Sequence, residues 1–158
     1  MPAAIPHALL AAFQDADYAV CAPGVRISLR IGRHSGELAA LLAQYGQPGI
    51  AILTAFNPLA ITASDDENRS AQASLLRAAR ALGLPCFEGE NSPGNGDGPS
   101  EPTVAVLGMS RERAQAMARQ FRQLAFVYAD AGAIPELVWA GPGKPRHNNL
   151  TQFRLAPD

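Results

Sequence analysis

Polar side chains that can recognise a ligand follow directly after one apolar segment of the chain. Residues 50–53 are all apolar, and Thr54 and Asn57 come immediately after them. The apolar run predicts a strand that is buried on both faces, and such a strand commonly delivers the side chains at its end to a site. Hydroxyl and amide groups form hydrogen bonds, so the pattern favours recognition of a small polar ligand or metabolite at the C-terminal end of strand 49–55.

A predicted helix start supplies further candidates. Ser64 and Glu67 have the spacing of a capping box, which explains Glu67 without any catalytic role. Asn68 lies seven positions before Leu75, a rotation of about 700°, so the two side chains share the buried face of the helix. We therefore expect Asn68 to point inward near Asn57. There it either pairs buried backbone groups of the turn at 54–58 or contacts a ligand.

Three charged residues complete the candidate site. Glu101 enters a predicted buried strand at 103–107, Arg69 follows the helix start, and Arg30 projects from the outer face of a predicted strand at 25–31. The predicted ligand-binding set is Thr54, Asn57, Glu67, Asn68, Arg69, Glu101 and Arg30. The sequence assigns no catalytic residue and no cofactor.

Familiar catalytic and metal-binding motifs are absent from the sequence. The three histidines are far apart, and no P-loop, GxGxxG or GxSxG motif occurs. Cys21 and Cys86 have no metal-ligand spacing and are expected to be reduced, buried thiols. The acids of segment 88–101 lack the order of a calcium loop, so no metal site is predicted.

The elements that must position these residues follow from apolar periodicity. We expect an α/β fold, with α+β as the alternative: a mixed sheet of about six strands, a leading hairpin around residues 22–24, and amphipathic helices packed over it. A strand, a helix beginning near Ser35 and ending at Gly46, and a second strand at 49–53 predict a right-handed crossover between parallel strands. A second such helix is predicted to begin at Ser110. Short strands are expected at 85–87, 125–128 and 136–139.

Several surface features have two interpretations. Segment 88–101 (EGENSPGNGDGPSE) is rich in turn residues and is expected to be a long loop, either a lid or a solvated surface. Arg111, Arg119 and Arg122 fall on one side of the helix that follows Ser110, where a solvated face is favoured over a phosphate or RNA patch. Gln123 is also expected to face water.

Composition limits the partners and the compartment. The chain has 158 residues, 47% of them hydrophobic, which suits one domain over 1–140 followed by a Pro/Gly-rich irregular tail over 141–158. Thirteen basic and 14 acidic residues leave a net charge of -1, so no bulk field attracts nucleic acid or a membrane. No segment resembles a signal peptide or a membrane span, which favours the cytoplasm. Nothing indicates the oligomeric state.

Several short motifs, spread over most of residues 18–139, are also informative in combination. They are Leu29-Arg-Ile-Gly32, Leu53-Thr-Ala-Phe-Asn-Pro58, Glu67-Asn-Arg69, Glu101-Pro102, Gly108-Met-Ser110 and Phe121-Arg-Gln-Leu-Ala125. Together they resemble a bacterial domain-of-unknown-function family marked by a threonine-alanine-x-asparagine-proline motif and a following glutamate-asparagine pair. That family tends to place a tryptophan where this chain has residues 98–100 and a glycine where it has Arg122. The resemblance implies no particular activity.

Two functions remain open at this point. In the first, the chain is a ligand-binding or enzymatic domain with a pocket at the end of strand 49–55 and a lid at 89–98. In the second, it is a non-catalytic protein-interaction or regulatory module. There the polar residues brace the turn, while Trp139, Phe153 or the tail contacts another protein. A concave pocket lined by Asn57, Asn68 and Glu101 favours the first, and a filled core with a flat apolar patch favours the second.

Overall fold

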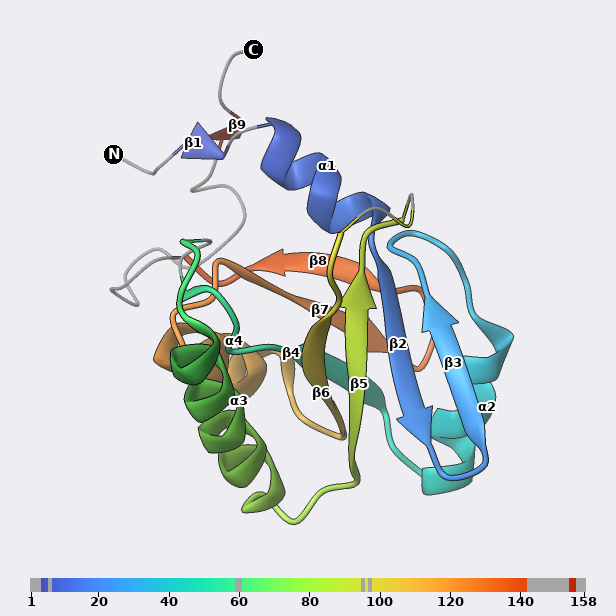
Figure 1. Cartoon of the computed structure of the whole chain (residues 1–158). Helices are drawn as coiled ribbons and strands as arrows, with labels where there is room; N and C mark the ends of the chain where they lie inside the picture. Colours follow the sequence, from blue (N-terminus) through green and yellow to red (C-terminus); the bar gives the residue numbers. More distant parts are fainter. Residues whose placement is uncertain are drawn as a thin grey trace.

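The computed structural model describes residues 4–5, 7–58, 61–94, 96, 98–141 and 154–155. Within them the chain forms helices interspersed with single strands and with pairs of consecutive strands (Figure 1). The elements in order are β1 (Ala4–Ile5), α1 (His7–Asp15), β2 (Asp17–Ala22), β3 (Val25–Leu29), α2 (Gly36–Tyr45), β4 (Gly49–Leu53), α3 (Asp65–Arg80), β5 (Cys86–Ser92), β6 (Glu101–Leu107), α4 (Arg111–Gln120), β7 (Ala125–Asp130), β8 (Glu136–Trp139) and β9 (Arg154–Leu155).

Seven strands form one sheet in the order β3-β2-β5-β6-β4-β7-β8. Figure 1 shows that the sheet is curled, because β7 and β8 run across the direction of β2 and β5. The mixed α/β class and the leading hairpin β2–β3 are confirmed. The strand count is close to the six that were predicted.

The predicted parallel crossover is wrong. Every neighbouring pair in the seven-stranded sheet is antiparallel, and three strands separate β3 from β4. Strand β4 instead pairs with β6 and β7, which come later in the chain. Apolar periodicity identifies which face of a strand is buried but does not identify its partner, so the pattern could not exclude this arrangement.

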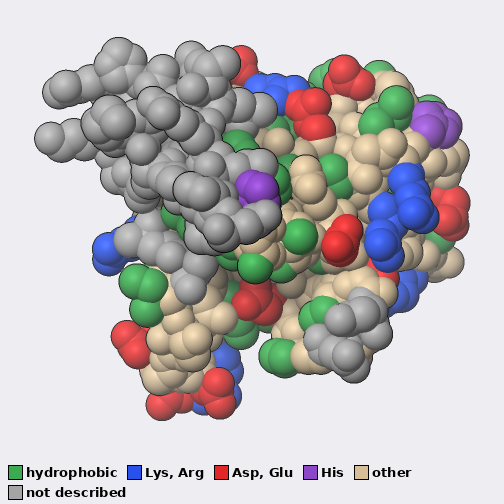
Figure 2. Space-filling view, turned by 90° about the horizontal axis from the view of Figure 1, so that it is seen from above, with side chains coloured by type: hydrophobic (Ala, Val, Ile, Leu, Met, Phe, Trp, Pro, Cys, Tyr) green, Lys and Arg blue, Asp and Glu red, His purple; other side chains and the backbone are tan. Residues whose placement is uncertain are grey.

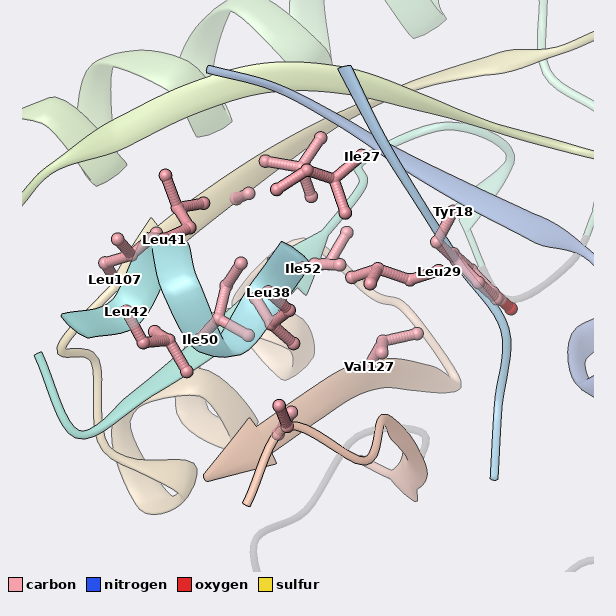
Figure 3. Close-up of a cluster of buried hydrophobic side chains, with 14 of the residues drawn as sticks. Tyr18, Ile27, Leu29, Leu38, Leu41, Leu42, Ile50, Ile52, Leu107 and Val127 are labelled. Atoms are coloured by element: carbon pink, nitrogen blue, oxygen red, sulfur yellow. The ribbon is translucent and has the colours of Figure 1, made fainter. Parts of the chain in front are cut away.

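Strand β4 lies at the centre of two hydrophobic layers. All five of its residues are buried, with Ile50 and Ile52 on one face and Ala51 and Leu53 on the other. The first face packs under α2, whose Leu38, Leu41 and Leu42 lie among the apolar side chains shown in Figure 3. The second face packs against side chains of α3 and α4. A strand covered on both faces accounts for the uninterrupted apolar run.

Serine caps begin three of the helices, as predicted. The hydroxyls of Ser35, Ser64 and Ser110 each accept a hydrogen bond from the amide three residues later, at 3.1 Å. Glu67 completes the capping box by accepting from the Ser64 amide at 3.2 Å. Gly46 ends α2 in the left-handed conformation.

The long loop predicted at 88–101 is much shorter in the structure. Strand β5 continues to Ser92 and β6 begins at Glu101, which leaves residues 93–100 between them. Pairing with β2 on one side and β6 on the other satisfies the β5 backbone despite its turn-forming residues. Gly89 permits this close pairing, since a Cβ there would lie 1.9 Å from the Ala19 carbonyl oxygen.

The remaining predictions about the fold have mixed outcomes. Cys86 is half-buried, but Cys21 is exposed, because it alternates with the buried residues of β2 and points away from the core. Helix α1 contributes Phe13, which packs edge-to-face against Trp139 with 5.7 Å between ring centroids. Of the predicted tail, residues 142–153 and 156–158 lie outside the described residues, so the division at residue 140 stays a prediction. No helix in the described ranges has the length and apolar character needed to cross a membrane.

The packing of α2 against β4 leads to the first testable prediction. Leu38 is fully buried between α2 and the sheet, so Leu38→Ala should lower the free energy of unfolding by about 2–5 kcal/mol. Urea unfolding followed by circular dichroism measures this loss. A loss below about 1 kcal/mol would contradict this position of α2.

Candidate functional site

The end of β4 meets the beginning of β6 because the two strands are antiparallel. Leu53 pairs with Val104, which places Thr54 next to the first residues of β6. The Thr54 hydroxyl donates to the Pro102 carbonyl oxygen at 2.9 Å and accepts from the Phe56 amide at 3.2 Å. The polar residues therefore converge through the antiparallel pairing of β4 and β6.

The turn after β4 is held by two asparagines. Asn57 has a left-handed backbone, with φ of 46°, a conformation that asparagine tolerates better than most residues. Its backbone amide donates to Oδ1 of Asn68 at 2.8 Å, and Nδ2 of Asn68 donates back to Oδ1 of Asn57 at 3.0 Å. Asn68 is only 5% exposed, as its place on the helix predicts. Its amide therefore pairs the buried backbone of the turn.

The Asn57 side chain also connects two other parts of the chain. Its Oδ1 accepts a second hydrogen bond from the Ala63 amide at 3.0 Å, just before α3 begins. Its Nδ2 donates to Oε2 of Glu101 at 3.1 Å, at the start of β6. One residue thus ties the turn, the entry to α3 and the Glu101 carboxylate together.

Two glutamines also support the turn. Neither of them was assigned to the site from the sequence. Oε1 of Gln72 accepts from the Ala55 amide at 2.9 Å, and Nε2 of Gln123 donates to the Phe56 carbonyl oxygen at 3.0 Å. Gln72 lies four residues after Asn68, so helical spacing could have identified it.

The expectation that Gln123 faces water is wrong, since this residue is 8% exposed. Helix α4 ends at Gln120, and Arg122 is left-handed with φ of 58°. Helical periodicity therefore no longer applies at Gln123.

A cavity of about 220 Å³ opens beside this turn; we call it the strand-end cavity. Its apolar walls come mainly from α1 and from strands β4, β7 and β8, and include Leu9, Phe13, Ile52, Val127 and Leu137. Its polar lining residues are Tyr18, Thr54, Asn57, Asn91, Glu101, Thr103 and Gln123. Apolar walls with a few convergent polar groups are typical of small-molecule sites.

Thr103 is a fully buried polar residue of this cavity whose side chain lacks a partner. It is 2% exposed, and its hydroxyl forms no hydrogen bond within the described part of the chain. A buried hydroxyl without a partner costs roughly 1–3 kcal/mol of stability. The hydroxyl of Thr54, just after the neighbouring strand β4, is by contrast hydrogen-bonded to Pro102 and to Phe56. The contrast singles out Thr103 as a group with hydrogen-bonding capacity that the fold does not use.

Glu101 brings negative charge into the same space. Asn57 is its hydrogen-bond donor, and Glu101 forms no ion pair with the cations in the described ranges. The Tyr18 hydroxyl lies nearby and donates to the Phe13 carbonyl oxygen at 2.6 Å. Burial, followed by the negative charge of Glu101, raises the pKa of Tyr18 well above its usual value, so the phenol stays protonated.

A second cavity of about 700 Å³ adjoins the first; we call it the outer cavity. Four residues line both cavities: Phe13, Tyr18, Asn91 and Glu101. The outer cavity is also lined by Asp15 and Arg30, and by Pro93, Gly94 and Pro99 of the segment between β5 and β6. Arg30 pairs with Asp17 at 3.1 Å.

The predicted site residues therefore fall into three groups. Thr54, Asn57 and Glu101 line the strand-end cavity, and Arg30 joins Glu101 at the outer cavity. Asn68 lies behind Asn57 and lines neither cavity. Glu67 and Arg69 are exposed, the first capping α3 and the second pairing with Asp66. The ligand-binding role of each residue stays a prediction.

Several arginines on the described surface are compensated by nearby acids. Arginines form ion pairs with nearby acids in each of the pairs Arg26–Glu90, Arg30–Asp17, Arg69–Asp66, Arg80–Glu88 and Arg111–Glu136. In the view of Figure 2, basic side chains likewise lie close to acidic ones on the coloured part of the surface. The predicted solvated face of α4 is only partly observed. Arg119 donates to the Ala140 carbonyl oxygen at 2.7 Å, and burial lowers its pKa.

Neither metal ligands nor an exposed tryptophan accompany this site. Within the described residues, no group of three or more His, Cys, Asp or Glu side chains is placed to hold a metal ion. Trp139, a predicted contact for another protein, is 9% exposed. Phe153, the other aromatic predicted for that role, lies outside the described residues.

Comparison with known proteins places much of this site in one matched segment. The sequence pattern of a family described as "Protein of unknown function (DUF3293)" matches residues 53–126, which confirms the predicted resemblance to a family of unknown function. No curated protein and no solved structure matches the chain. The matched segment includes the turn, Asn68, Glu101, Thr103 and Gln123.

The amide pair of the turn gives a second testable prediction. Asn68→Leu removes the partner of the Asn57 backbone amide, so the free energy of unfolding should fall by about 1–3 kcal/mol. Asn91→Leu is the matched control, because no hydrogen bond of the Asn91 side chain would be lost. Denaturant unfolding of both variants tests this. Equal stability of Asn68→Leu and the wild type would show that Asn68 does not hold the turn.

Substitution by valine at Thr103 and, for comparison, at Thr54 gives the third testable prediction. Thr103→Val removes a buried hydroxyl without a partner, so it should leave the ligand-free protein as stable or raise the free energy of unfolding by up to about 2 kcal/mol. Thr54→Val removes a hydroxyl with two partners and should lower it by about 1–3 kcal/mol. Thermal unfolding compares the two variants. A clear destabilisation by Thr103→Val would mean that the fold itself uses this hydroxyl.

Proposed function

We propose that this domain binds a small molecule in the strand-end cavity. The observation that carries the proposal is that Thr103, a residue lining the cavity, has a buried hydroxyl without a protein partner. Buried polar groups are nearly always hydrogen-bonded, and exceptions call for an explanation such as a bound ligand. A ligand atom that hydrogen-bonds to Thr103 would remove the cost of this group.

The cavity supports a ligand of modest size. Its volume of about 220 Å³ is below the roughly 300–1,000 Å³ of sites for drug-sized molecules. The adjoining outer cavity offers space for a longer molecule to extend past Glu101. A compact metabolite with an apolar portion therefore suits the strand-end cavity best.

In this proposal, the residues that contact the ligand differ from the residues that hold the turn in place. Both ends of the Asn57 amide are already engaged by Asn68, Ala63 and Glu101, so Asn57 shapes the site and holds the carboxylate. Among the groups with unused capacity are the Thr103 hydroxyl, the Glu101 carboxylate and Oε1 of Gln123, for which no donor lies within the described residues. These three are proposed to contact the ligand.

A thermal-unfolding screen against a panel of metabolites tests the proposal and is the fourth prediction. A ligand present at about 100 times its dissociation constant should stabilise the fold by roughly 2.7 kcal/mol, which raises the unfolding midpoint by roughly 5–10 °C. Ala125→Leu should abolish the shift, because residue 125 lines the cavity and the larger side chain would fill it.

Ala73→Leu is the matched control, because Ala73 is exposed on α3 and does not line the cavity. This variant should retain the shift. A ligand shift that survives in Ala125→Leu would place the ligand elsewhere and contradict the proposal.

A further inference from the structure

Among the described residues that line the strand-end cavity, Glu101 is the one with a charged side chain. The other polar groups of its lining are hydroxyls and amides, and Tyr18 stays protonated. The described part of the cavity lining therefore offers a carboxylate and neutral hydrogen-bonding groups, with no cation among the described residues to receive an anionic ligand.

The adjoining outer cavity adds to this negative charge. Its charged lining residues are Asp15, Glu101 and Arg30, and the charge of Arg30 is already compensated by Asp17. Electrostatic attraction across both cavities therefore favours a cation at their junction, where Glu101 lies.

The hydrogen bonds of Glu101 leave room for such a cation. An ionised carboxylate accepts up to about four hydrogen bonds, and the fold supplies one, from Asn57 to Oε2. The apolar walls of the cavity include Phe13, Ile52 and Leu9. Apolar walls lower the local dielectric and therefore strengthen a charge-assisted hydrogen bond. An ammonium group matches this position because it carries only donors and a positive charge.

We propose, on the basis of the function proposed above, that the ligand is a small primary amine with an apolar body. Its ammonium group donates to the Glu101 carboxylate. Its apolar body lies between α1 and the strands β4, β7 and β8 that form the walls. An anionic ligand of the same shape is excluded by the Glu101 carboxylate.

Three molecules of the same size and different charge test this inference, which is the fifth prediction. They are 2-phenylethylamine as the cation, 2-phenylethanol as the neutral analogue and phenylacetate as the anion. Binding of each is measured by NMR titration or calorimetry to the wild type, to Glu101→Gln and to Glu90→Gln. Glu90 is the matched control, because it pairs with Arg26 on the surface and lines neither cavity.

The expected result is a preference for the amine that depends on Glu101. The wild type and Glu90→Gln should bind the amine at least about tenfold more tightly than the alcohol, because its hydrogen bond to the carboxylate is charge-assisted. Neither protein should measurably bind phenylacetate. Glu101→Gln should bind the amine and the alcohol about equally, and its unfolding midpoint shows whether it is folded.

Other outcomes overturn the inference without removing the proposed function. Equal binding of the alcohol, tighter binding of phenylacetate, no binding of the amine up to millimolar concentration, or an unchanged preference in Glu101→Gln would each exclude an amine ligand. A ligand of another charge whose binding is blocked by Ala125→Leu would leave the strand-end cavity as the binding site. A metabolite shift that survives in Ala125→Leu would instead contradict the proposed function itself.

Discussion

The reciprocal hydrogen bonds between Asn57 and Asn68 are the constraint on which the site depends. They hold a left-handed residue in the turn after β4 and fix the first turn of α3 against it. Through the same asparagine, the Glu101 carboxylate is held at the start of β6. Since β4 and β6 are antiparallel, this turn determines where their polar side chains meet. The cavity is therefore shaped by groups that are themselves already paired, whereas the Thr103 hydroxyl has no partner and Glu101 has a single donor.

The curled sheet explains why a cavity exists on one side of β4. On that side α2 fills one part of the apolar face with Leu38, Leu41 and Leu42 (Figure 3). Farther along the same face, α1 contributes Leu9 and Phe13 to the walls of a space that remains open. On the opposite side, α3 and α4 supply side chains to the second core cluster. One face of the sheet thus holds both a packed core and the candidate site. The residues that support the turn come from the opposite face.

Local features could be predicted from the sequence, and pairings over long distances could not. Ser64, Glu67 and Asn68 were placed correctly because capping and helical spacing depend on residues within two turns. The partners of β4 were not, since periodicity contains no information about which strands meet. Gln123 was misplaced because the left-handed Arg122 interrupts the helix just before it. Thr103 gave no signal at all, because an unused hydrogen-bonding group is visible only when its neighbours in space are known.

A fragment screen followed by NMR of the methyl groups shows whether the strand-end cavity is a ligand site. The methyl groups of Ile52, Thr103 and Val127 line the cavity, whereas those of Val106 and Leu75 lie in the opposite core. If the cavity is a ligand site, fragments that bind should shift the methyl resonances of the first group together and leave those of the second group unchanged. This effect should be lost in Ala125→Leu. Shifts confined to other surfaces, or none across a library of cationic, neutral and anionic fragments, would contradict it.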